Sequence, residues 1–135
     1  MEAAAVDRVI QAALADSSDE RARILVCLAE DLRAAGRAET ALRVLDAAWE
    51  LRPSEDARRA VFTAAIQAHC DLDRHAVAEA VEREQAPRSV DAAFARAALR
   101  LYSALSRMTG LDTHHARRAH YLAYLAGAAL PAAAE

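Results

Sequence analysis

The residues best suited to chemistry are arginines in the C-terminal third of the chain. On a helical wheel, three arginines of a predicted helix over residues 89–109 fall within about 40° of one another: Arg96, Arg100 and Arg107. They lie opposite an apolar face that contains Phe94 and Leu101. A row of guanidinium groups can bind carboxylates or phosphates. The alternative interpretation is a solvated face, because all 17 basic residues of this chain are arginine.

A second stripe of chemically versatile side chains follows on the last predicted helix: His114, Arg117, Tyr121 and Tyr124. Cationic and aromatic groups together suit stacking on a peptide or on a planar ligand. The alternative is that the tyrosine rings pack half-buried against a neighbouring helix, with their hydroxyls in water. The stripe is predicted to lie beside a core face made of Ala119, Leu122, Leu125 and Ala126. The predicted partner-binding residues are therefore Arg96, Arg100, Arg107, Arg117, Tyr121 and Tyr124.

Patterns of common catalytic and metal sites are absent from the sequence. It has no glycine-rich phosphate loop, no G-x-S-x-G and no H-E-x-x-H. Asp112 and Thr113, just before His114, are more simply explained as a helix cap. No two of the five histidines have the i, i+4 spacing of a helical zinc site. We therefore predict no catalytic residues, no metal site and no cofactor.

The charge of the chain is unevenly distributed. Residues 1–87 carry 11 arginines and 17 acidic residues, whereas residues 88–120 carry 6 arginines and 2 aspartates. The basic segment could lie along phosphates, but the net charge of −3 gives no general signal for nucleic-acid binding. No helix-turn-helix with a polar recognition helix is visible. Nucleic acid is therefore a disfavoured partner.

Hydropathy and cysteine usage indicate the cellular compartment of the protein. Glu2 stands where a signal peptide carries positive charge. The longest uncharged stretch, residues 121–134, is shorter than the roughly 20 residues that a membrane span needs. Cys27 and Cys70 lie within apolar helical patterns, which predicts buried free thiols in a reducing compartment. We predict a cytoplasmic protein without a membrane span.

Apolar periodicity predicts the elements that carry these residues. Apolar side chains recur every three or four positions along most of the chain, as on residues 3–15, where the predicted core face is Val6, Val9, Ile10, Ala13 and Leu14. With 3 glycines, 3 prolines and no asparagine, the chain lacks the turn residues of an all-β fold. The sequence predicts seven helices and no strands, over residues 3–15, 19–35, 38–51, 54–70, 74–85, 89–109 and 114–128.

The turns inside successive helix pairs are periodic. They fall near residues 36, 71 and 110, and a period in the thirties with two helices per unit is typical of a helical solenoid. Gly36 is expected to take a positive φ that closes a helix. Residues 25–53 resemble a tetratricopeptide repeat (TPR), with large, small and turn residues in the order of that family: Leu25, Leu28, Ala29, Leu32, Gly36, Ala41, Leu45, Ala48 and Pro53.

The later units resemble the family less closely. The second keeps Phe62, Thr63 and Ile66, but its register is expected to slip so that Ala76 and Ala80 take the small and packing positions. The third keeps Leu99, Tyr102, Ser103 and Gly110. The resemblance implies helical hairpins and protein binding. It does not imply binding of acidic C-terminal peptides, because TPR domains with that activity use Lys and Asn, and this chain has neither.

The sequence thus predicts one all-α domain over residues 1–135. It comprises a capping helix (1–18), three TPR-like antiparallel hairpins (19–53, 54–87 and 88–128) and a tail (129–135). The expected function is a non-catalytic adaptor that binds a protein or peptide, including partners with acidic groups. Two alternatives stay open: a small-ligand sensor, as in helical-repeat regions of bacterial regulators, and a self-associating module that forms a homo-oligomer.

Overall fold

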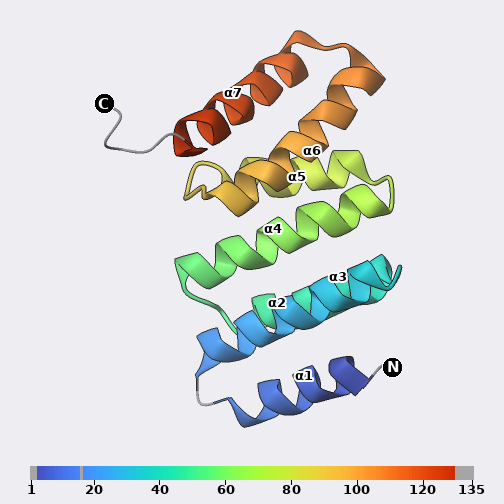
Figure 1. Cartoon of the computed structure of the whole chain (residues 1–135), viewed down its shortest axis with the longest axis vertical. Helices are drawn as coiled ribbons and strands as arrows, with labels where there is room; N and C mark the ends of the chain where they lie inside the picture. The colour runs from blue at the N-terminus through green and yellow to red at the C-terminus, as the bar shows by residue number, and fades with distance from the viewer. Residues whose placement is uncertain (1–2, 16, 130–135) are drawn as a thin grey trace.

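The computed structural model describes residues 3–15 and 17–129, and over these residues its secondary structure consists of α-helices without strands (Figure 1). The prediction of an all-α fold is confirmed. Side-chain caps fix two helix starts: Ser17 accepts a hydrogen bond from the backbone N–H of Glu20, and Asp91 accepts one from that of Phe94. The helices are α1 (Ala3–Leu14), α2 (Ser18–Ala34), α3 (Ala38–Glu50), α4 (Glu55–Asp71), α5 (His75–Gln85), α6 (Ala92–Thr109) and α7 (Asp112–Ala129).

The helices stack in chain order, with α1 at one end of the molecule and α7 at the other (Figure 1). Helix α2 packs against α3, α4 against α5, and α6 against α7. Helices α2, α4 and α6 also pack side by side. On the other side of α4 the arrangement is open, because no Cα atom of α3 lies within 8 Å of one in α5. Helix α4 is thus covered differently on its two sides.

Each turn between paired helices contains one residue with a left-handed backbone conformation. Gly36, Asp73 and Gly110 have positive φ values of 78°, 56° and 65°, and they are spaced by 37 residues. In the first two turns, the residue after the left-handed one donates its N–H to the carbonyl five positions earlier, at 2.8 Å in both. This bond and the left-handed residue close the preceding helix. The positive φ expected at Gly36 is confirmed, and the second turn, predicted near residue 71, closes at Asp73.

The 37-residue spacing also sets which alanine of α5 is buried. Ala41 on α3 is buried against its neighbours, and so is Ala78, which stands 37 residues later. The prediction that Ala76 and Ala80 take these positions is wrong, since both are exposed. The physical reason is the position of the turn: closure at Asp73 rotates α5 so that Ala78 points inward.

Two hydrophobic clusters form the core. One is built from α1–α4 around Leu28, Leu45 and Val61, and the other from α4–α7 around Ile66, Phe94 and Leu101. Small alanines occupy many of the buried positions, which lets the helices approach closely. Among the two cysteines, Cys70 is buried as predicted, but Cys27 is exposed. Burial raises the pKa of the Cys70 thiol.

The first helix turns a different face inward from the one predicted. Ala5 and Ala12 are buried, whereas Val6, Val9 and Ile10 are exposed and Leu14 is 76% exposed. Because α1 is the end helix, only α2 covers it, and the small alanines give the closest approach. Within the described ranges, no helix has both the length and the hydropathy of a membrane span.

Candidate functional site

The structure does not gather the three predicted arginines of α6 into one site. All three are exposed. Arg96 lines a depression of about 330 Å³ formed by α2, α4 and α6. Arg100 is held by Gln67 Oε1 at 2.7 Å and by Asp71 Oδ1 at 2.7 Å. Arg107 lies about 16 Å from Arg96 along the helix. Their role in partner binding stays a prediction.

The predicted inward face of α7 is wrong at three of its four residues, and only Leu125 packs against the core as predicted. Tyr121 is only 1% exposed and His114 is buried, whereas Leu122 is 41% exposed. Ala119 and Ala126, predicted to be in the core, are exposed as well. Tyr124 lies at the margin, where its hydroxyl donates to the carbonyl of Val90 at 3.2 Å. The stripe expected on the surface is therefore mostly the packing face of the helix.

Glu82 of α5 explains why α7 turns His114 and Tyr121 inward instead of Leu122. Its side chain is fully buried, and it stands 37 residues after the buried Leu45 of α3. Its Oε1 accepts a hydrogen bond from the Tyr102 hydroxyl at 2.5 Å. Its Oε2 accepts hydrogen bonds from the Tyr121 hydroxyl and from Arg117 Nη2. A carboxylate buried without partners is very costly, so α7 turns its polar face toward α5.

Burial fixes the protonation of the groups around this carboxylate. It raises the pKa of Tyr102 and of Tyr121, and their hydrogen bonds to Glu82 raise both further. Burial alone lowers the pKa of Arg117, but the hydrogen bond and charge of Glu82 outweigh it, and the pKa is raised overall. The two hydroxyls and the guanidinium thus stay protonated donors. We assign Arg117 and Tyr121 to this interior network.

An open site lies on the other side of α4, in the gap between α3 and α5. Three depressions of about 650, 230 and 310 Å³ follow one another along this gap. Trp49 lines the first and the second, and Leu42, Asp46 and His69 line the second and the third. The shared residues make the depressions one continuous feature, which we call the α4 groove.

The middle of the α4 groove is mainly apolar, with Asp46, His69 and Glu84 as its polar lining residues. Besides Trp49, its apolar lining residues come from all three helices: Leu42, Leu45, Val61, Phe62, Ala65 and Val81. Trp49 is 41% exposed, although the apolar period that buries Ala41, Leu45 and Ala48 on the same helix predicts a core position for it. Its ring centroid lies 5.2 Å from that of Phe62. Burial and the nearby Arg74 lower the pKa of His69, which favours its neutral form at this part of the groove.

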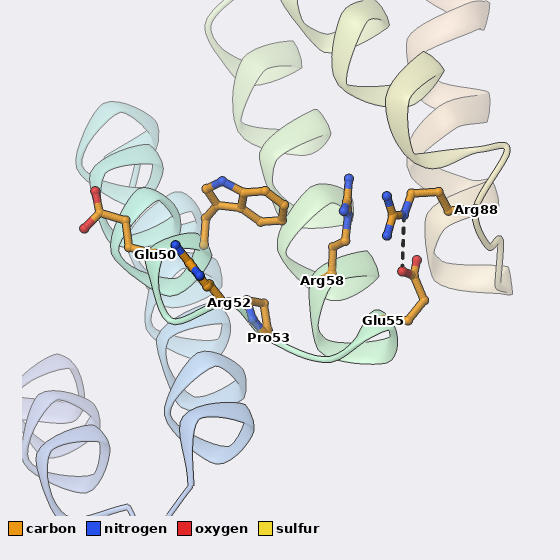
Figure 2. A pocket seen from close by; sticks show the side chains of 7 residues that line it. Glu50, Arg52, Pro53, Glu55, Arg58 and Arg88 are labelled. Atoms are coloured by element: carbon orange, nitrogen blue, oxygen red, sulfur yellow. Dashed lines mark hydrogen bonds and ion pairs between the residues drawn. The ribbon is translucent and has the colours of Figure 1, made fainter.

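One end of the α4 groove is rich in arginine (Figure 2). Arg58 of α4 lies over two adjacent aromatic rings, with its Cζ atom 4.8 Å from the centroids of both Trp49 and Phe62. Its Nε donates to Gln85 Oε1 at 3.2 Å, and its Nη2 lies 3.4 Å from Glu84 Oε1. These contacts hold the guanidinium in one orientation.

Arg88, after α5, and Glu55, at the start of α4, close the same end. Arg88 Nε donates to Glu55 Oε2 at 3.3 Å. Glu55 Oε1 accepts from Gln85 Nε2 at 3.0 Å and from the Ser89 hydroxyl at 3.1 Å. The hydrogen bond from Gln85 is the main reason that the pKa of Glu55 is lowered. Glu55 is therefore an ionised, fully engaged carboxylate.

The residue types of the α4 groove suit binding. An aromatic and aliphatic floor can cover apolar side chains, and the arginine end can hold an anion. Over residues 3–15 and 17–129, no three His, Cys, Asp or Glu side chains come close enough to hold a metal ion. No protein-family model matches the chain, and comparisons with curated proteins and with solved structures find no significant match.

Sequence reasoning missed the α4 groove because its residues come from three helices. Trp49 and Phe62 fit apolar helical stripes, which predicts core positions. Only one signal was available: the single tryptophan stands three residues before Arg52, at a chain reversal marked by Pro53. The gap between α3 and α5 depends on the packing of whole helices, and the periodicity of a single helix does not report it.

Proposed function

We propose that this chain is a non-catalytic module that binds a segment of another protein in the α4 groove. The observation that carries the proposal is the uncovered side of α4, flanked by α3 and α5 and lined by exposed and half-buried apolar side chains. Apolar grooves between helices accept apolar anchor residues of a partner segment. Trp49 is the expected anchor on this chain, because half-exposed tryptophans often dominate interface energetics.

The length of the α4 groove fits a short segment. Helix α4 has 17 residues, which corresponds to about 25 Å. An extended chain of about seven or eight residues spans this distance, as does a helix of about four to five turns. We also propose that the chain is a TPR-like repeat protein, as the sequence resemblance implies, and that it is cytoplasmic, as its cysteine usage and hydropathy indicate. The 37-residue spacing of its left-handed turn residues supports the repeat part of this proposal.

A small ligand is a second candidate occupant. The arginine end has a volume of about 650 Å³, which falls within the roughly 300–1,000 Å³ of small-molecule sites. This depression is lined by Trp49 and by charged residues, a combination that suits a planar or aliphatic anion. The continuous extension of the groove past Leu42 and His69 favours the longer occupant.

Selection of peptides displayed on phage tests the proposed function. We expect the full chain to enrich peptides that bind at micromolar or better affinity. Trp49→Ala should weaken their binding by about 30-fold or more, because it removes an anchor worth roughly 2 kcal/mol. Leu122→Ala is the matched control, since Leu122 on α7 is equally exposed at 41%. Failure to enrich any peptide, or equal losses in the two variants, would contradict the proposal.

A further inference from the structure

We propose that the arginine end of the α4 groove recognises one carboxylate of the bound segment, from an Asp or Glu that neighbours an apolar residue packed on Trp49. The recognising side chains are Arg52, Arg58 and Arg88. The inference rests on the proposed function of the α4 groove and adds the chemistry of its partner.

The three arginines have hydrogen-bond donors to spare. Arg58 uses Nε and Nη2 on neighbouring side chains, which leaves Nη1. Arg88 uses Nε on Glu55, which leaves both of its Nη groups. Among the described residues, the side chain of Arg52 has no hydrogen bond or ion pair. Figure 2 shows Arg88 extending toward Arg58 across the end of the groove. A carboxylate between these side chains would accept several charge-assisted hydrogen bonds.

The balance of charge favours a single carboxylate. Three arginines line this end, and two nearby carboxylates, Glu55 and Glu84, already contact Arg88 and Arg58. Glu50 also lines the depression, but its carboxylate points away from Arg58 and Arg88 (Figure 2). About one positive charge is therefore left without a counter-ion on the protein. A carboxylate would neutralise it, whereas a doubly charged phosphate would leave an excess of negative charge.

The rigidity of Arg58 strengthens the case. Its side chain is 12% exposed, which is low for an arginine beside an open depression. The flanking rings of Trp49 and Phe62 and the buried Gln85 hold it in place before any ligand arrives. A pre-organised donor loses little conformational entropy on binding. Because Trp49 lies directly beside Arg58, the residue that packs on its ring must be close to the acidic one.

Two libraries of capped eight-residue peptides test this inference. One carries Asp or Glu at a single position among apolar residues, and the other carries Asn or Gln at the same position. Both are passed over the immobilised full chain, and the retained peptides are counted by mass spectrometry. We expect about tenfold stronger retention of the acidic library, since a charge-assisted hydrogen bond contributes more than a neutral one.

Two double variants test which arginines cause the preference for acidic peptides. Arg52→Gln with Arg88→Gln should reduce the acidic preference to less than about twofold. The double variant Arg96→Gln with Arg107→Gln makes the same change of charge at exposed positions of α6, and it should leave the preference unchanged. The inference is overturned, but not the proposed function, if the chain retains both libraries equally. The same holds if only the α6 double variant loses the preference for the acidic library. Retention of neither library overturns both.

Discussion

At the scale of single residues, Glu82 has the largest expected effect on folding. It is a fully buried carboxylate on α5 that accepts hydrogen bonds from Tyr102, Tyr121 and Arg117. The network joins α5 to α6 and α7. Because Glu82 accepts a hydrogen bond from all three side chains, removing it takes a partner from each of them, and only Arg117 and Tyr102 keep a hydrogen bond to one another.

Glu82→Ala is expected to lower the free energy of unfolding by about 3–5 kcal/mol, because it leaves the buried Tyr121 hydroxyl without an acceptor and the Arg117 guanidinium without its counter-ion. Urea denaturation followed by circular dichroism measures the change. Glu50→Ala is the control, since Glu50 is exposed and should change stability by less than about 0.5 kcal/mol. A loss below about 1 kcal/mol for Glu82→Ala would mean that the network does not stabilise the fold.

The same network predicts alkaline sensitivity. The pKa values of Tyr102 and Tyr121 are raised above the ordinary value of 10.0. Above about pH 10 the unfolded chain loses phenolic protons that the folded chain keeps, so the free energy of unfolding should fall as pH rises. For two such groups the slope reaches at most about 2.7 kcal/mol per pH unit.

Urea denaturation between pH 9 and pH 11.5, together with the absorbance of tyrosinate, measures this effect. Both tyrosines should ionise only as the chain unfolds. Cys70 has a raised pKa as well, and the Cys70→Ala variant separates its contribution. A folded chain in which all three tyrosines ionise freely would contradict the buried network.

At the scale of elements, the sequence predicts the presence of the helices well and their orientation less well. The apolar period locates all seven, because burial of one face imposes it on each. It misjudges α1, whose larger apolar residues are exposed at the end of the stack. It also misjudges α7, because Arg117 and Tyr121 read as surface residues until the buried partner on α5 is known. Neither a single helix nor its period contains that information.

The register of α5 gives a direct test at this scale. Ala78→Leu should overpack the α4–α5 contact and lower the free energy of unfolding by about 1–3 kcal/mol. Ala76→Leu, two residues away and exposed, should change it by less than about 0.5 kcal/mol. Thermal denaturation of both variants decides between the two registers. The opposite ranking would restore the register expected from the sequence.

At the scale of the whole molecule, the two sides of α4 differ. On one side α4 packs directly against both α2 and α6, whereas on the other side α3 and α5 stand apart. The candidate site predicted from the sequence lay on α6 and α7. The structure also places three depressions on the open side, and Trp49 lines two of them. These depressions depend on how whole helices pack, which the residue pattern of a single helix does not report.

The most direct test of binding in the α4 groove is NMR mapping of the tightest peptide recovered by display. The indole N–H of Trp49 and the backbone amides around Leu42, Ala65 and Val81 should show the largest shift changes on titration. Residues around Arg96, on the opposite side of α4, should remain unperturbed. The largest changes around Arg96, with none at Trp49, would place the binding surface on α2, α4 and α6 and contradict the proposed site.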